Sequence, residues 1–192
     1  MTTPAAATRK YTVAEYLDIE RRSGEKHAFY NGAIEPMAGA SISHNRIVRN
    51  LLAVLCNIFA ERPEFEIFGS DQKIYLPKLN YYLYPDAVVV AEGIIESEEE
   101  AQAIINPLLI FEVLSPSTDQ YDRSIKFAEY QSIPTFKEYV LVRQDTPELT
   151  LFFREEPDLW RTSEVSGLDN SAHLRSVTVN LALKSIYHKV FS

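Results

Sequence analysis

The stretch LLIFEVLSPST, residues 108–118, holds one ionisable side chain, Glu112, inside a run that is otherwise apolar up to Ser115. Apolar residues occupy both alternating sets of positions around Glu112, so neither face of a strand formed here is expected to meet water. Burying an unpaired carboxylate is costly, and such a group shifts its pKa, finds a partner or binds a metal ion. The sequence therefore predicts a strand inside a sheet, with a partner for Glu112. The alternative is an edge strand whose carboxylate faces water.

The segments around this strand predict an α/β fold with a mixed sheet. A helix is expected over residues 119–131 and a strand at EYVLV, residues 138–142, an order that implies a parallel crossover. On the N-terminal side, residues 41–61 have apolar residues at helical spacing and end before Pro63. Residues 65–76 and 82–91 are rich in aromatic and β-branched residues and read as strands. The expected core, residues 41–143, is thus helix, three strands, helix, strand.

Shorter elements are expected at both ends of the chain. Thr12 and Glu15 have the spacing of a capping box at the start of a helix, and the dipeptide Asn31-Gly32 favours a tight hairpin turn. Near the C-terminus, LTLFF and LWRTSEV predict a second hairpin, and LALKSIYHKVF predicts a closing helix. A length of 192 residues fits one compact domain spanning residues 1–192.

Composition and charge narrow the classes of function. The chain is 46% hydrophobic and 24% charged, as in an ordinary globular protein. A net charge of −8 argues against tight non-specific binding of nucleic acid, which depends on Lys and Arg. This net charge does not exclude a nuclease in which metal ions and a local cationic patch bind the polyanion. The sequence has no Gly-rich phosphate loop and no zinc-type spacing of its four histidines, so we expect no small-molecule cofactor.

Cysteine usage and hydropathy predict a cytoplasmic protein. Cys56 is the one cysteine, which fits a reducing compartment, and its apolar neighbours favour a buried core position. The apolar run over residues 51–60 is too short for a membrane span of about 20 residues. The N-terminal stretch MTTPAAATRKYT lacks the pattern of a signal peptide.

A second carboxylate, Asp86, follows Pro85 at the start of the segment DAVVVAE. If this strand neighbours the strand of Glu112, cross-strand side chains would lie roughly 5 Å apart, close enough to share a divalent ion. Mg²⁺ prefers one or two carboxylates together with water and a substrate phosphate. Asp86 and Glu112 therefore form a candidate minimal site for phosphodiester hydrolysis. The plainer interpretation is that Pro-Asp only initiates a strand.

Such chemistry benefits from a cation near the transition-state charge. The position two residues after Glu112 shares its face of the strand, but it is Leu114. The following helix offers Lys126, with Asp122 four residues before it and Tyr130 four residues after it on one helical face. Lys73 is the other candidate cation. A simple salt bridge between Asp122 and Lys126 would equally explain their spacing.

Several segments, in this order, resemble a family of restriction endonucleases abundant in cyanobacteria, within the PD-(D/E)XK nuclease superfamily. They are FYNGAIEPMAGASISHN, YYLYPDAVVV, FEVLSPST and KEYVLV, together with Asp122, Lys126 and Tyr130. The resemblance implies a restriction-endonuclease-like αβββαβ core in which Asp86 and Glu112 fill the acidic positions of the motif. It also implies that Leu114 stands where a lysine is usual and that Lys126 is its migrated replacement.

The resemblance implies a Mg²⁺- or Mn²⁺-dependent endonuclease that acts on DNA, with Lys126 stabilising charge. Asp86, Glu112 and the carbonyl of Val113 are the implied metal ligands, and a homodimer is expected because cutting both strands requires two sites. The supporting residues that we expect near the site are His44 on the leading helix, Asp71, Lys73, Asp122, Tyr130 and Glu35.

The sequence departs from the family pattern at Ala28, where family members have a glutamate two residues before the YNG turn. Glu35, across the expected hairpin, could compensate for the missing carboxylate. A second hypothesis follows, in which the chain is a nuclease fold that no longer cuts and serves as a binding or interaction module. A third hypothesis keeps the same site and changes the substrate to RNA or another phosphodiester.

Overall fold

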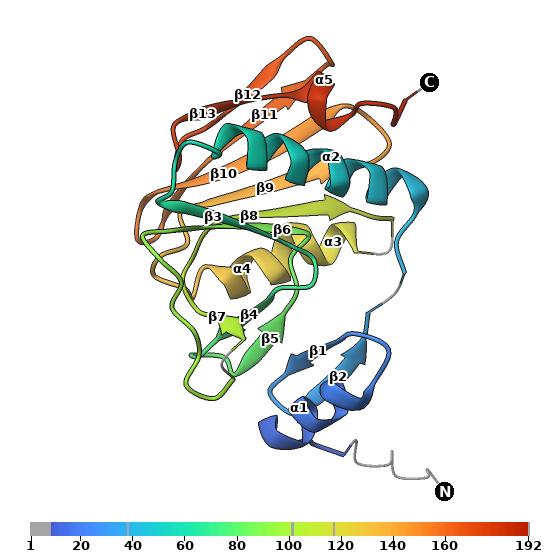
Figure 1. The fold of residues 1–192 in the computed structure, drawn as a ribbon, viewed down its shortest axis with the longest axis vertical. Coiled ribbons are helices and arrows are strands. Elements are labelled where there is room, and N and C mark those ends of the chain that lie inside the picture. The colour runs from blue at the N-terminus through green and yellow to red at the C-terminus, as the bar shows by residue number, and fades with distance from the viewer. Residues whose placement is uncertain (1–8, 38, 101, 117, 192) are drawn as a thin grey trace, which may run out of the picture.

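The fold consists of two mixed β-sheets, one small hairpin and helices on their faces, in a computed structural model that describes residues 9–37, 39–100, 102–116 and 118–191 (Figure 1). The six-stranded sheet has the order β11-β10-β9-β8-β6-β3 and the five-stranded sheet has the order β2-β1-β5-β4-β7. The two ends of the described chain lie at opposite ends of the molecule (Figure 1). Within the described residues, no helix is long and apolar enough to cross a membrane.

The helices are mostly short. They are α1 (Val13–Arg22), α2 (Ile42–Ile58), α3 (Asp119–Tyr121), the π-helical turn η1 (Asp122–Lys126), α4 (Phe127–Tyr130) and α5 (Leu183–Ile186). Helix α1 begins with the expected capping box between Thr12 and Glu15. Helix α2 is capped by the side chain of Ser41.

The strands of the six-stranded sheet are β3 (Phe65–Gly69), β6 (Ala87–Ala91), β8 (Pro107–Leu114), β9 (Glu138–Arg143), β10 (Glu148–Glu156) and β11 (Leu159–Ser166). Those of the five-stranded sheet are β1 (His27–Tyr30), β2 (Ala33–Pro36), β4 (Lys73–Leu76), β5 (Tyr81–Leu83) and β7 (Ala103–Ile104). Strands β12 (Ser171–Leu174) and β13 (Val179–Ala182) form a separate hairpin.

The expected core topology is confirmed. Helix α2, strands β3, β6 and β8, the helical segment α3-η1-α4 and strand β9 occur in this order along the chain, with β4, β5 and β7 of the other sheet inserted among them. Strands β3, β6, β8 and β9 are neighbours in one sheet. Strands β6 and β8 are antiparallel, whereas β8 and β9 are parallel and joined by the helical crossover. This is the αβββαβ arrangement that the sequence predicted.

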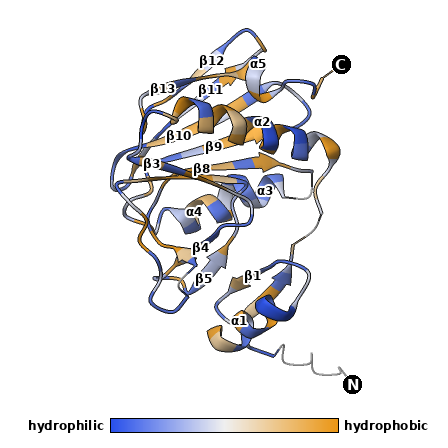
Figure 2. Cartoon of the chain, in the orientation of Figure 1, coloured by the Kyte–Doolittle hydropathy of each residue, from blue (hydrophilic) through white to orange (hydrophobic). Residues whose placement is uncertain are grey.

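Alternation along β8 divides the interior into two cores. Leu109, Phe111 and Val113 face a core that they share with α2, α5 and the β12-β13 hairpin. Ile110 and Leu114 face the other core, between the two sheets, which also contains Tyr130 of α4. Figure 2 shows hydrophobic residues along β8 and its neighbours, as expected for a strand covered on both faces. Glu112 lies on the same face of β8 as Ile110 and Leu114, the face that points toward the five-stranded sheet.

Two expected strands are each divided between the two sheets, so their predicted extents were wrong. Residues 65–76 form β3 and β4, separated by a turn in which Gln72 N–H donates to the carbonyl of Gly69 at 3.0 Å. Residues 82–91 contain the end of β5 and then β6, and residues 84–86 bridge from one sheet to the other. Apolar and aromatic composition alone does not reveal such a crossing, because both halves are buried.

The bridge before β6 is anchored to the N-terminal helix. The hydroxyl of Tyr84 donates to Glu20 Oε1 of α1 at 2.7 Å, and the backbone N–H of His27 donates to the same carboxylate. Tyr16 of α1 lies in a third apolar cluster with Tyr82 of β5. Helix α1 therefore packs on the five-stranded sheet, close to the residues that lead into β6.

Other details also differ from the predictions. The closing helix is limited to the four residues of α5, because Leu181 and Ala182 pair as a strand with β12, a hairpin that the sequence did not predict. The expected helix over residues 119–131 is present but contains the π-helical turn η1. Cys56 is exposed on α2, so the prediction of a buried cysteine was wrong. It lies on the side of the amphipathic helix that faces solvent.

Candidate active site

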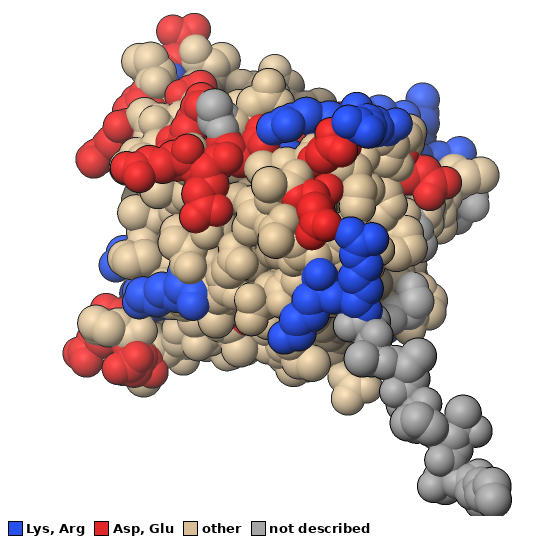
Figure 3. All heavy atoms as spheres, turned by 90° about the horizontal axis from the view of Figure 1, so that it is seen from below, with Lys and Arg blue, Asp and Glu red and all other residues tan. Residues whose placement is uncertain are grey.

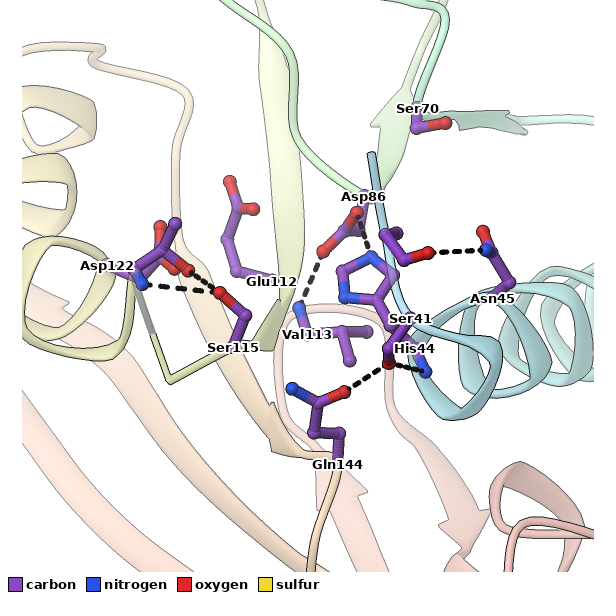
Figure 4. Close-up of polar contacts among 12 residues, drawn as sticks. Ser41, His44, Asn45, Ser70, Asp86, Glu112, Val113, Ser115, Asp122 and Gln144 are labelled. Atoms are coloured by element: carbon purple, nitrogen blue, oxygen red, sulfur yellow. Dashed lines mark hydrogen bonds and ion pairs between the residues drawn. The ribbon is translucent and has the colours of Figure 1, made fainter. Parts of the chain in front are cut away.

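Asp86 and Glu112 lie at corresponding positions of adjacent antiparallel strands. Ala87 of β6 is paired with Phe111 of β8, and Asp86 and Glu112 are the next residues beyond that pair. Figure 4 shows the two side chains on either side of β8 near its C-terminal end. The candidate site depended on their strands being neighbours, and the sheet order shows that they are.

Both carboxylate oxygens of Asp86 accept hydrogen bonds. His44 Nε2, on the first turn of α2, lies 3.0 Å from Oδ1, and the backbone N–H of Val113 donates to Oδ2 at 2.7 Å. The strand pairing between β6 and β8 extends to Ala87 and Phe111, and beyond it the backbone N–H of Val113 donates to the side chain of Asp86. These contacts fix the direction of the Asp86 carboxylate.

Glu112 has the partner that its burial requires. Lys126 Nζ lies 2.7 Å from Glu112 Oε1 and 3.5 Å from Asp122 Oδ1, and the hydroxyl of Tyr130 donates to Glu112 Oε1 at 3.2 Å. Glu112 and Asp122 are each 4% exposed and Lys126 is 9% exposed. The plain salt bridge between Asp122 and Lys126 is therefore present, but the closer contact of Lys126 is with Glu112.

The helical segment explains how these groups meet. The π-helical turn η1 contains both Asp122 and Lys126, and Tyr130 ends the following helix α4. This segment covers the face of β8 that carries Glu112. Short π-helical turns occur frequently at functional sites, because the extra residue redirects side chains within a helix.

Burial and like charges shift the proton equilibria of this cluster. Burial raises the pKa of Glu112 to about 8, with Asp122 and Asp86 adding to the rise and Lys126 opposing it. Burial also raises the pKa of Asp122. Burial disfavours the charge on Lys126, yet Glu112 and Asp122 together raise its pKa above the ordinary value of 10.5. Lys126 is thus held as a cation among carboxyl groups that repel one another.

The remaining candidates lie elsewhere. Asp71 forms an exposed ion pair with Lys26, with 2.8 Å between Oδ1 and Nζ. Lys73 is on β4 of the five-stranded sheet, paired with Ala103. Glu35 pairs with Ala28 across the β1-β2 hairpin, as expected. None of the contacts described for these three residues reaches Asp86 or Glu112.

Ala28 lies inside the core between the two sheets. It belongs to the same apolar cluster as Tyr130, and Tyr30 on the same strand is hydrogen-bonded to Tyr121, with 3.0 Å between the two hydroxyl oxygens. Tyr121 directly precedes Asp122 in the chain. The N-terminal hairpin therefore borders the helical segment of the site, although this chain has no carboxylate at position 28.

The structure adds residues that the sequence did not single out. Ser41 Oγ accepts from the backbone N–H of His44 at 3.1 Å and donates to Gln144 Oε1 at 2.6 Å (Figure 4). Ser41 was recognisable as a residue type that caps helices. Gln144 directly follows β9, and no pattern in the sequence indicated that it would meet the start of α2.

A cavity of about 180 Å³ opens at the C-terminal ends of β8 and β9, beside these groups. Its lining residues are Leu114, Ser115, Pro116, Asp119, Arg143, Gln144 and Asp145. Arg143 is held by both oxygens of Asp145, at 3.0 and 2.8 Å. The cavity places polar side chains next to the end of the strand that carries Glu112.

The oxygen donors present suit a hard divalent ion. Within the described residues, no three His, Cys, Asp or Glu side chains already form a metal-binding arrangement. Asp86 and Glu112 still match the one or two carboxylates by which Mg²⁺ is usually held, with water completing its shell. Burial chiefly raises the pKa of Glu112, and the carboxyl groups of Asp122 and Asp86 add to the rise, an effect that a bound cation would oppose. The residues therefore fit such an ion.

The fold is that of a restriction-endonuclease-like protein, and the candidate acidic residues lie at one end of its six-stranded sheet. The family model described as "Uma2: Putative restriction endonuclease" matches residues 13–184, and the chain belongs to this family. Two proteins of Synechocystis sp. strain PCC 6803 are similar over most of their length. "Uncharacterized protein sll1609" is 37% identical over 162 residues, 84% of this chain and 91% of the relative. "Uncharacterized protein slr1290" is 33% identical over 184 residues, 96% of this chain and 95% of the relative.

A solved structure has the same fold. The crystal structure of a "putative nuclease belonging to DUF820" from Anabaena variabilis ATCC 29413 matches with a TM-score of 0.75, covering 94% of this chain and 99% of that one. The sequence identity is 15%, so the likeness concerns the fold. It agrees with the restriction-endonuclease-like core predicted from the sequence.

Proposed function

We propose that this protein is an endonuclease that hydrolyses phosphodiester bonds of DNA with a divalent metal ion, Mg²⁺ or Mn²⁺. The observation that carries the proposal is the meeting of three groups from separate parts of the chain, Asp86, Glu112 and Lys126, at one end of the six-stranded sheet. Membership of a restriction endonuclease family supports the same class of activity.

Each group has a distinct role in the proposal. Asp86, Glu112 and the carbonyl of Val113 would hold the metal ion, which when bound supplies polarisation of the phosphate and acidification of a water molecule. Lys126 remains protonated and stabilises negative charge that develops on the phosphate. Tyr130 orients Glu112 through its hydroxyl. The cavity beside Gln144 offers room for substrate next to these groups.

The distribution of charged side chains favours binding of DNA at a restricted area of the surface rather than over the whole surface. The net charge of the chain is −8. On the face shown in Figure 3, basic side chains form small groups separated by acidic and uncharged surface. Broad electrostatic attraction of a polyanion is therefore weak, and binding relies on the ion and on few cations.

We further propose that the chain acts as one domain, residues 1–192 with a core over residues 41–143, and as a cytoplasmic homodimer. Cleavage of both DNA strands is supported by two copies of the site, one for each strand. Sedimentation velocity measures the oligomeric state directly, and a monomer at all accessible concentrations contradicts the homodimer.

Two observations favour a second candidate function, that of a nuclease fold that binds but does not cut. Ala28 takes the position of a carboxylate that the family pattern contains, and it faces the core of the site region. In addition, Lys126 is already engaged by Glu112 and Asp122. RNA is a further candidate substrate for the same groups.

Cleavage of supercoiled plasmid DNA with Mg²⁺ or Mn²⁺ tests the proposal. We expect nicking or linearisation that requires the metal ion and is lost in Asp86→Asn and Glu112→Gln. Asp71→Asn is the matched control, because Asp71 is an exposed carboxylate paired with Lys26, and it should retain activity. Activity that is equal in the wild type and in the Asp86 and Glu112 variants contradicts the proposal.

Calorimetric titration with Mn²⁺ separates the two candidate functions. A nuclease of the proposed kind binds the ion, and Glu112→Gln weakens that binding. A wild-type protein that neither binds Mn²⁺ nor cleaves DNA or RNA supports the non-cutting module.

A further inference from the structure

Asp86 is held by donors on two different elements. Its Oδ1 lies 3.0 Å from His44 Nε2 of α2, and its Oδ2 accepts from the N–H of Val113 on β8. An ionised carboxylate only accepts hydrogen bonds, so the short contact requires a hydrogen on His44 Nε2. The lone pair of that nitrogen is then not available to a metal ion. The contact gives His44 a role in orienting Asp86.

His44 is itself fixed by the start of α2. Its backbone N–H donates to Ser41 Oγ, and the same hydroxyl donates to Gln144 Oε1 at the end of β9. The side chains of His44 and Asp86 are 14% and 16% exposed, so surrounding atoms restrict both of them. A series of hydrogen bonds thus runs from Gln144 through Ser41 and His44 to Asp86 and ends at Val113 (Figure 4).

We propose that His44 is a positioning residue of this site, which sets the carboxylate of Asp86 from helix α2 while Gln144, through Ser41, sets the start of the helix. The inference rests on the proposed function, because the oriented carboxylate is the one that would hold the metal ion. Residues that orient metal-binding carboxylates typically change metal affinity by about 10- to 100-fold when they are removed.

The variants His44→Gln and His44→Asn form a matched pair. The amide nitrogen of Gln can occupy roughly the place of imidazole Nε2, whereas that of Asn is too close to the backbone. We expect His44→Ala and His44→Asn to weaken Mn²⁺ binding by about tenfold or more, and His44→Gln to restore it to within a few-fold of wild type. Gln144→Ala should change the affinity in the same direction by a smaller factor. His173→Ala is the control, because His173 contacts Asn180 in the separate β12-β13 hairpin.

Spectroscopy of bound Mn²⁺ distinguishes positioning from ligation. A positioning residue gives no coupling between the ion and an imidazole nitrogen in pulsed electron paramagnetic resonance of the wild type. Such a coupling that disappears in His44→Ala overturns the inference, because His44 is then a ligand. An Mn²⁺ affinity of His44→Ala equal to that of the wild type overturns it as well.

A readout that needs no metal keeps this inference separate from the proposed function. The backbone amide of Val113 donates to Asp86, so its proton chemical shift reports the orientation of that carboxylate. We expect this resonance to move in His44→Ala and to return toward its wild-type position in His44→Gln. An unmoved Val113 resonance refutes the positioning role. A wild type that fails to bind Mn²⁺ while the resonance moves as expected refutes the proposed function alone.

Discussion

Lys126 Nζ lies 2.7 Å from Glu112 Oε1, and the helix and the strand that carry these two residues bury both of them. Asp122 is the second carboxylate within reach of the same ammonium group. Two buried carboxyl groups thus share one buried cation. Removing the cation leaves two buried carboxyl groups without their partner, and the loss of one member of a buried ion pair is strongly destabilising.

Lys126→Met should therefore destabilise the fold by about 3 kcal/mol, measured by chemical denaturation at neutral pH. Adding Glu112→Gln to Lys126→Met should recover part of this loss, because the neutral amide no longer needs a cation and still accepts from Tyr130. Lys137→Met, at an exposed lysine, should change the free energy of unfolding by less than about 0.5 kcal/mol. Equal stabilities of Lys126→Met and Lys137→Met would contradict the buried pair.

Alkaline pH should weaken the fold through its buried tyrosines. Burial raises the pKa of Tyr130 and Tyr139 well above the ordinary value of 10.0, and burial also raises the pKa of Tyr187. Below pH 10 these groups are neutral in both the folded and the unfolded chain. Above it the unfolded chain ionises while the folded chain does not, so the free energy of unfolding falls.

Unfolding free energies at about pH 9 and about pH 11 measure this loss, and Tyr139→Phe should lose less over that interval. Absorbance of tyrosinate provides the second measurement. Fewer than the 11 tyrosines of the chain should ionise before the fold is lost. Complete ionisation with intact secondary structure would be inconsistent with the burial of these rings.

The turn of the N-terminal hairpin requires glycine at position 32, whereas position 24, after α1, should tolerate alanine. Gly32 has φ +104°, and a Cβ placed there would lie 3.2 Å from Cβ of Lys10. Gly32→Ala should cost about 1–2 kcal/mol. Gly24→Ala is the matched control, because no atom lies within 4 Å of the Cβ that it adds, and its effect should stay within about 0.5 kcal/mol. Similar thermal unfolding midpoints for the two variants would contradict the prediction, because they would show that the backbone of the turn can adjust to a side chain at position 32.

Sequence reasoning was most reliable where a pattern depends on local chain geometry. The apolar run around Glu112 indicated a covered strand, and the strand-helix-strand order indicated the parallel pairing of β8 with β9. Asp86 and Glu112 occupy corresponding positions because β6 and β8 are neighbours in the sheet. Lys126 reaches Glu112 because the helical segment packs on the face of β8 that points toward the five-stranded sheet.

The features that could not be predicted depend on contacts between distant parts of the chain. Gln144 meets Ser41 across 103 positions of sequence, and nothing local to either residue encodes that contact. Helix α5 is short because the preceding residues pair with β12, although their helical pattern is continuous. Asp71 was expected among the supporting residues of the site, whereas in the turn after β3 its side chain pairs with Lys26.

Asp86 sits on a span of three residues between the two sheets, and the Tyr84–Glu20 hydrogen bond ties the beginning of that span to the N-terminal helix. A change in how the two sheets pack would therefore act on this carboxylate through the span that carries it. We expect substitutions in α1 that remove the contact between Tyr84 and Glu20 to displace Asp86, although α1 contributes no residue to the candidate site.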